Sequence, residues 1–319
     1  MHINVDLVSP DPVRPGRWME DLKDVLGTRS LREVTIPGSH NSGSDVLAEG
    51  PAPGAPSAYA AMPCFIRKWS ECQSADVGAQ LQGGVRYVDL RTAAVPGKEG
   101  LRVVHALCGG PMRRVLDQVA AFVASTTHEI VVVDFQHFYG LATEDHAGLL
   151  DTCLALFGPA ACIPPGRAGA SLESLWAAEQ RVLLLWGDKA FAPTRPNVLH
   201  ERPLVIRSPW AGPGQTASAA SRRRFKARLE GYVAAAEGDT LCVLQCVSGP
   251  DAGMVVGSLL AGCGTCTHLR SYANAFNREL EGWLRHDWAQ LSVNIVLLDF
   301  STENQGLVDA VIAMNRTRR

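Results

Sequence analysis

The feature that most constrains the fold is a series of short apolar runs that alternate with helical stretches along the whole chain. Two runs, 130–135 and 182–186, are continuously apolar, which is typical of strands buried on both faces. Further strand-like runs lie at 31–36, 85–91, 101–105, 204–207, 241–247 and 293–300. Helical spacing predicts helices at 18–26, 76–82, 111–125, 149–156, 221–236 and 271–288. Such alternation indicates parallel βα units.

We therefore expect an α/β fold, with one barrel as the first interpretation and a doubly wound open sheet as the alternative. No Gly-rich dinucleotide or P-loop fingerprint follows a strand, which weakens the nucleotide-binding form of that alternative. The chain has 319 residues and no dividing linker, so we expect a single domain over 1–319. Residues 1–17 are predicted to be a lead-in. Residues 49–63, rich in Pro, Ala and Gly, are predicted to be a mobile insertion.

Composition narrows the classes of partner. A formal charge of −2 argues against nucleic acid, and no apolar run is long enough to span a bilayer. The N-terminus lacks the features of a signal peptide, and the nine scattered cysteines suit free thiols. These points predict a cytoplasmic, monomeric protein. Cys263 and Cys266 have the spacing of a redox or zinc pair, but a second pair is lacking nearby, so neither role is favoured.

Polar side chains follow the predicted strands at their carboxyl ends. Each of these residues could also have a structural role instead of a catalytic one, as a loop histidine, a member of an ion pair or a helix cap. In a barrel, however, these strand ends converge on one face, and the first and last strands are neighbours. The residues in chain order are His40, Asp89, Arg91, His105, Asp134, Gln136 and Asp299.

The set supplies what metal-free cleavage of a phosphodiester requires. One imidazole can take a proton from the attacking hydroxyl, while the other gives one to the leaving oxygen. A guanidinium stabilises charge on the phosphoryl oxygens, and a carboxylate orients the base. Together the residues favour an active site.

Several stretches resemble the X domain of phosphatidylinositol-specific phospholipase C. They are 36–42, 69–70, 84–91, 103–105, 129–134 and 298–300, in the order found in that family, and the resemblance runs from about Trp18 to Met314. It implies a distorted, incompletely closed TIM-type (β/α)8 barrel. It also implies a phosphodiesterase in which the inositol 2-hydroxyl attacks its own phosphorus, releasing diacylglycerol and forming an inositol 1,2-cyclic phosphate.

The resemblance implies a role for each matched residue. His40 matches the general base, His105 the general acid, Arg91 the phosphate-stabilising group and Asp299 the partner of His40. By the same resemblance, the remaining catalytic candidates are Asn41 and Asp89.

The family offers two electrostatic solutions, one with calcium and one with an arginine. Asn41 matches the calcium-dependent members, which hold the ion through an Asn and nearby acids. Arg91, however, stands where the metal-independent members have an arginine, and Gln136 stands where calcium enzymes have a glutamate. We therefore expect metal-independent catalysis without a cofactor, with Ca²⁺ as the alternative.

Substrate recognition is matched more loosely. The expected substrate is a phosphoinositide lipid, reached by transient contact with a membrane surface through 49–63 or the basic stretch 221–228. The alternatives are a phosphoinositide-binding protein with weak or no catalysis and a calcium-dependent phosphodiesterase of the same barrel type. Candidate substrate-binding residues are Asp134, Gln136, Asp188, Lys189, Arg207 and Trp210.

Overall fold

A computed structural model describes residues 12–48, 50–208, 210, 212–235, 240–260 and 268–317. The Cys263–Cys266 pair and residues 1–11 of the predicted lead-in lie outside the described residues. Residues Pro15–Arg17, at the end of that lead-in, form a short 3₁₀ turn.

The described strands form one ten-stranded sheet, whose main path runs β7-β6-β5-β2-β1-β10-β9-β8 with parallel pairing throughout. An antiparallel hairpin, β3–β4, branches from β2. The strands are β1 (Ile36–Ser39), β2 (Tyr87–Ala93), β3 (Arg102–His105), β4 (Leu107–Pro111), β5 (Val131–Tyr139), β6 (Val182–Trp186), β7 (His200–Glu201), β8 (Ile206–Arg207), β9 (Leu241–Cys246) and β10 (Ile295–Leu298).

This strand order is that of a barrel opened between β7 and β8. Apart from the hairpin, the strands follow the chain in a cycle, and β1 pairs along its full length with the last strand, β10. The two edge strands are not paired with each other in the described part of the sheet. The predicted incompletely closed α/β barrel is confirmed, and the doubly wound alternative is wrong.

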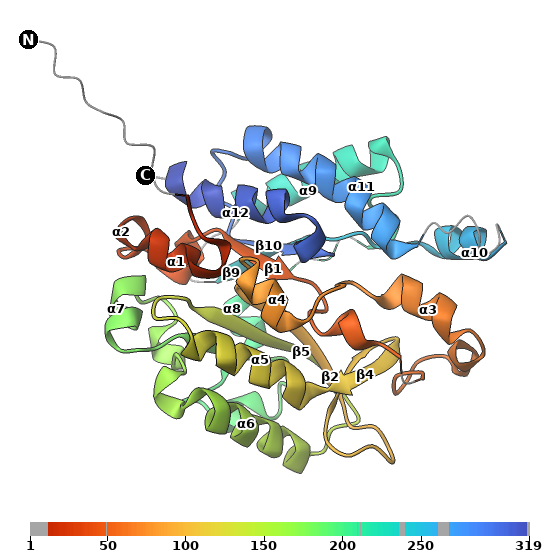
Figure 1. Cartoon of the computed structure of the whole chain (residues 1–319), viewed down its shortest axis with the longest axis horizontal. Helices are drawn as coiled ribbons and strands as arrows, with labels where there is room; N and C mark the ends of the chain where they lie inside the picture. The colour runs from red at the N-terminus through yellow and green to blue at the C-terminus, as the bar shows by residue number, and fades with distance from the viewer. Residues whose placement is uncertain are drawn as a thin grey trace, which may run out of the picture.

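Helices cover the outside of the curved sheet. In Figure 1, α9, α11 and α12 lie on one side of the sheet, and α5 and α6 lie on the other. Within the described residues, none of the helices is both long enough and apolar enough to cross a bilayer. The helices are α1 (Trp18–Asp21), α2 (Lys23–Leu26), α3 (Pro63–Ser70), α4 (Val77–Gln82), α5 (Met112–Ala124), α6 (Thr143–Phe157), α7 (Leu172–Ala177), α8 (Arg202–Val205), α9 (Ala219–Ala234), α10 (Ala252–Leu260), α11 (Leu269–Gly282) and α12 (Gln305–Thr317).

The first strand begins later than its sequence pattern predicts. Ser30 and Glu33 form a reciprocal capping box, which folds Leu31–Glu33 into a 3₁₀ turn instead of a strand. The strand then runs through Pro37 and Gly38, beyond the predicted end at Ile36. Glycine suits position 38 because the Tyr87 side chain on β2 lies 3.0 Å from where a β-carbon would be, so a larger residue would require Tyr87 to shift. Local capping therefore overrides the alternating pattern.

Three other expectations need correction. Only half of the run 204–207 is strand, because α8 occupies Arg202–Val205 and β8 is limited to Ile206–Arg207. The helix predicted at 76–82 begins at Val77, because the side chain of Asp76 caps α4 by accepting from Ala79 N. Part of the predicted insertion at 49–63 is structured, with a bridge from Pro51 to Leu107 and a 3₁₀ turn at Ser57–Ala61.

A buried ion pair attaches the N-terminal helices to the barrel. Arg86, immediately before β2, is fully buried and contacts the fully buried Glu129, with 2.6 Å between Nη2 and Oε2. The same carboxylate accepts from the backbone N–H groups of Met19 and Glu20 on α1. Both charges are removed from water. Loss of either residue would therefore leave the other as an unpaired buried charge, which would destabilise the fold.

Candidate active site

A cavity of about 640 Å³ opens where β1, β2 and β5 end. Among the residues that line it are His40, Arg91, His105, Gln136 and Trp210. His40, Arg91 and Gln136 meet because parallel strands present their carboxyl ends at the same edge, whereas His105 is contributed by the antiparallel hairpin β3–β4. The structure therefore brings five of the predicted site residues to one cavity.

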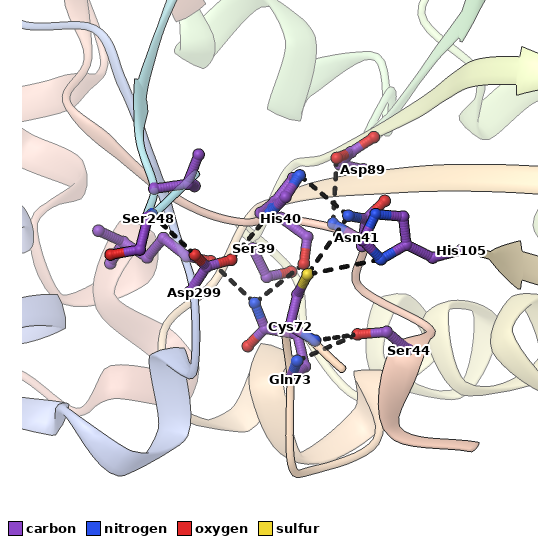
Figure 2. A network of polar contacts seen from close by, with 12 residues as sticks. Ser39, His40, Asn41, Ser44, Cys72, Gln73, Asp89, His105, Ser248 and Asp299 are labelled. Carbon is purple, nitrogen blue, oxygen red and sulfur yellow. Dashed lines mark hydrogen bonds and ion pairs between the residues drawn. The ribbon is translucent and has the colours of Figure 1, made fainter. Parts of the chain in front are cut away.

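His40 is held by hydrogen bonds on both ring nitrogens (Figure 2). Its Nδ1 lies 2.8 Å from Asp299 Oδ1, and its Nε2 lies 2.9 Å from Asn41 Nδ2. Asp299 follows β10, the neighbour of β1, and its second oxygen accepts from Ser248 N at 3.0 Å. A carboxylate fixed in this way selects the imidazole tautomer that carries its hydrogen on Nδ1. The lone pair of Nε2 is then available to accept a proton.

His105 faces His40 across the cavity. The two ring centroids are 6.1 Å apart, and the rings are inclined by 70°. His105 donates from Nδ1 to the Ser70 carbonyl oxygen at 2.6 Å, so its Nε2 is the nitrogen that can take or give a proton. Two oriented imidazoles therefore flank the same space.

The two imidazoles have opposite electrostatic environments. Burial alone lowers the pKa of His40, but the acids Cys72 and Asp299 beside it outweigh burial and hold that pKa well above its ordinary value. Burial, the Arg91 cation and the charge of His40 lower the pKa of His105 to about 3. These surroundings therefore favour the protonated form of His40 and the neutral form of His105.

Arg91 is placed by an irregularity in the sheet. The register of β2 against β5 shifts after Leu90, so Arg91 pairs with His137 and Gln136 is the extra residue of a bulge. Arg91 Nε is buried and has no hydrogen-bond partner among the described residues. The guanidinium is therefore available to an anion in the cavity.

Asn41 and Asp89 lie beneath His40 rather than along the cavity wall. The Asn41 backbone N–H donates to Asp89 Oδ2 at 3.0 Å, and Asn41 adopts a left-handed backbone with φ of 44°. Both residues are buried. In the described part of the chain, Asn41 Oδ1 and Asp89 Oδ1 have no hydrogen-bond partner.

Three predicted substrate-binding residues lie at or beneath the cavity. Gln136 lines it, and Trp210 lines its mouth with 56% of its surface exposed. Asp134 lies behind the wall, where both of its oxygens accept from Arg202 Nε at 2.9 Å and one also accepts from the Tyr87 hydroxyl. Burial raises the pKa of Asp134 to about 6 against the pull of Arg202. Asp134 therefore positions Arg202 instead of meeting the cavity itself.

The other three candidates are not brought to the cavity. Asp188 accepts from the backbone N–H groups of Ala190 and Phe191, so it caps a turn beyond β6. Lys189, the next residue, is exposed. Arg207 donates to the Ala235 carbonyl oxygen at 2.8 Å, away from the cavity lining. These three residues were candidates because they lie near strand ends in the sequence. That criterion takes no account of the local turns that direct their side chains elsewhere.

Sequence reasoning missed several residues of the site. Arg202, His137 and Gln245 line the cavity, and only their nearness to strand ends could have indicated them. Cys72 lines it too, with Sγ 3.8 Å from His105 Nδ1. Gln73 joins the first and last strands, since its Nε2 donates to the His40 and Leu298 carbonyl oxygens. Cys72 and Gln73 lie just after the 69–70 stretch, and that position was the only indication of them in the sequence.

Several curated proteins are similar to this chain in sequence. PI-PLC X domain-containing protein 3 of Danio rerio is 28% identical over 323 residues, covering 95% of this chain and 94% of the relative. This chain is related to the PI-PLC X domain-containing proteins. The Homo sapiens protein 3 is 28% identical over 211 residues, which cover 62% of this chain and 61% of that protein. A variant-surface-glycoprotein phospholipase C of Trypanosoma cruzi is 35% identical over 150 residues, covering 42% of this chain and 39% of that protein. No model of a known protein family matches the chain.

Solved structures share the fold of this relative of the PI-PLC X-domain proteins. A phosphatidylinositol-specific phospholipase C of S. aureus superposes with a TM-score of 0.67 at 14% identity, covering 93% of this chain and 97% of that one. The Listeria monocytogenes enzyme gives 0.66 at 14% identity, covering 96% and 100%. At such identities the likeness supports the barrel fold alone.

Proposed function

We propose that this protein is a phosphodiesterase that cleaves the glycerol–phosphate bond of phosphatidylinositol-type phospholipids. The observation that carries the proposal is the pair of imidazoles, His40 and His105, that face each other across a cavity also lined by Arg91. The products are diacylglycerol and inositol 1,2-cyclic phosphate. The sequence relatives named above, the PI-PLC X domain-containing proteins and the variant-surface-glycoprotein phospholipase C, support the choice of substrate class.

His40 is the general base in this proposal. Nε2 takes the proton of the inositol 2-hydroxyl, which replaces the Asn41 amide at that nitrogen. The hydroxyl oxygen then attacks the phosphorus. Asp299 holds Nδ1–H and stabilises the imidazolium as it forms. The raised pKa of His40 makes it a strong base once its own proton has left.

His105 and Arg91 act on the phosphodiester and its leaving group. Arg91 donates to the phosphoryl oxygens and offsets their growing charge. A bound phosphodiester anion offsets the Arg91 cation, which is one of the causes that lower the pKa of His105. The substrate therefore raises the pKa of His105, so that Nε2 gains a proton and delivers it to the glycerol oxygen. The P–O bond to glycerol breaks as the P–O bond to the inositol oxygen forms.

We propose that this chemistry proceeds without calcium. Asn41 Oδ1 and Asp89 Oδ1 are oxygens of the kind calcium prefers. Calcium takes about six to eight oxygen ligands, however, whereas Gln136 contributes no charge and the Arg91 cation lines the same cavity. The set of donors does not fit calcium, so the guanidinium takes the electrostatic role of a metal.

The test is a headgroup-release assay over phospholipids that share acyl chains and differ in headgroup, with and without excess chelator. We expect phosphatidylinositol to be cleaved in chelator and ³¹P NMR to detect the cyclic phosphate. A His105→Ala variant is the matched control for contaminating activity. Binding of phosphoinositide vesicles without headgroup release by the wild-type protein would identify a lipid-binding protein instead. Activity that is lost in chelator and restored by calcium would overturn the metal-free mechanism.

A further inference from the structure

A third side chain, that of Cys72, completes a cluster with His40 and Asp299. Cys72 follows α3, His40 follows β1 and Asp299 follows β10, so three separate segments contribute to it. One ligand atom of each residue lies within 4.8 Å of those of the other two. Figure 2 shows the sulfur, the imidazole and the carboxylate directed toward one another. In the proposed phosphodiesterase reaction the thiol neither donates nor accepts a proton.

The three side chains are held in place by neighbouring groups. The Cys72 backbone N–H donates to Ser44 Oγ at 3.0 Å, which fixes the start of the cysteine side chain. Asp299 Oδ2 accepts from Ser248 N at 3.0 Å. Partners of this kind orient metal ligands and are part of a working metal site. The cluster is therefore largely preorganised for an ion.

The kinds of donor decide which ion fits. A thiolate and an imidazole are soft or borderline ligands that select zinc-like cations over calcium or magnesium. Cys72 and His40 both line the cavity, which leaves a fourth position open to water. Zinc is usually four-coordinate, and three protein ligands plus one open position satisfy it.

We propose that His40, Cys72 and Asp299 bind Zn²⁺ and that the bound ion inhibits the enzyme. On binding, Cys72 and His40 each release a proton to water, so that Cys72 coordinates as the thiolate and His40 as the neutral imidazole. The ion is then coordinated by the His40 imidazole, which can no longer act as the base. Ion binding is independent of the reaction, whereas the inhibition rests on the proposed function.

The first experiment examines the wild-type protein, stripped of metal with chelator and exchanged into metal-free buffer. One equivalent of Zn²⁺ is added, and X-ray absorption reports its ligands. We expect one sulfur at about 2.3 Å and nitrogen or oxygen ligands at about 2.0 Å. Co²⁺ in place of Zn²⁺ should give a thiolate-to-metal charge-transfer band. A zinc coordination shell without sulfur would refute the site. A coordination shell with two sulfurs would assign zinc to a cysteine pair instead.

Variants identify the cysteine involved. All are made in a Cys263→Ser/Cys266→Ser background, which removes the competing pair. Cys72→Ser should lose the cobalt band and bind Zn²⁺ at least about tenfold more weakly. Cys64→Ser is the matched control, because Cys64 is exposed at the start of α3 and should leave both readouts unchanged. A band that survives Cys72→Ser in folded protein, or disappears in Cys64→Ser, overturns the assignment.

The activity arm separates this inference from the proposed function. With phosphatidylinositol vesicles, Zn²⁺ should inhibit the Cys64→Ser variant, and chelator should restore its rate. The concentration for half inhibition should rise at least about tenfold in Cys72→Ser, relative to the metal-free rate of that variant. Zinc that binds at Cys72 in a protein without phospholipase activity would sustain the metal site and refute the proposed function. Zinc that binds there and accelerates the reaction would overturn the inhibitory role.

Discussion

Replacing Asp299 by asparagine tests the hydrogen bond that orients His40. Ser248 N–H donates to one carboxylate oxygen at 3.0 Å, while His40 Nδ1 lies 2.8 Å from the other. In Asp299→Asn the amide oxygen must stay with the Ser248 donor, because an NH₂ group there would face another N–H. The NH₂ group then faces His40 Nδ1 and donates to it. Neutral His40 is left with its hydrogen on Nε2, the nitrogen that must accept a proton.

The expected loss follows from that tautomer. General-base catalysis contributes about 10²–10⁴-fold, so kcat of Asp299→Asn should fall by about that factor, or about 2.7–5.5 kcal/mol in the barrier. The pKa of His40 should also fall, since the carboxylate is one of the groups that raise it. The alkaline limb of the pH–rate profile should then move to lower pH. KM should change little, because Asp299 contacts His40 and not the proposed substrate.

The assay measures the release of water-soluble inositol phosphate from phosphatidylinositol vesicles across a range of pH, in the presence of chelator. Asp309→Asn is the matched control, because Asp309 is exposed on α12 and should leave kcat unchanged. Circular dichroism and thermal unfolding establish that both variants fold. A folded Asp299→Asn variant with a kcat near that of the wild type would refute the assignment of His40 as an oriented base.

Four further predictions concern the same site and its support. His105→Ala should lower kcat at least about a hundredfold, since it removes the general acid. Arg91→Lys should remain strongly impaired with or without chelator, because an ammonium keeps the charge but loses the two-pronged contact with phosphoryl oxygens. The profile of kcat/KM against pH should be a broad bell: its acid limb reflects the lowered pKa of His105, about 3, and its alkaline limb the raised pKa of His40. Glu129→Ala should lower the free energy of unfolding by about 3–5 kcal/mol, measured with urea, because it strands the buried Arg86 cation.

Each of these has an outcome that contradicts it. Near wild-type turnover in His105→Ala would remove the histidine from the acid role, and full activity in Arg91→Lys would show that charge alone suffices. A rate that rises steadily beyond about pH 9 would exclude a paired-imidazole scheme. The exposed Asp117, paired with Arg113, is the control for Glu129: Asp117→Ala should change stability by less than about 1 kcal/mol. Equal effects at the two positions would contradict the argument from burial.

Much of the site could be predicted from sequence because a parallel α/β barrel has a simple rule of placement. Residues at the carboxyl ends of strands share one edge. The apolar runs located the strand that contains Gln136 and the strand that precedes Asp299, whereas the run before His40 overlaps its strand only at Ile36; the structure brings all three residues to the edge where the cavity opens. The rule depends only on strand direction and order.

The rest depended on contacts between segments that no local pattern encodes. Asp188 and Arg207 satisfy the strand-end rule, yet a local turn and a contact with Ala235 keep them from the cavity. Arg202 reaches the cavity because the buried Asp134 holds it there.

The sequence by itself determined the class of fold and most of the proposed catalytic set, because hydrophobic periodicity and the order of elements are properties of the chain itself. Only the tertiary structure decided the opening between β7 and β8 and the bulge that places Arg91 beside Gln136. It alone also decided that Cys72 lies against His40 and Asp299. These features arise from strand register and from loops packed against distant segments. Their positions are set by interactions summed over the whole chain, which no short stretch of sequence specifies.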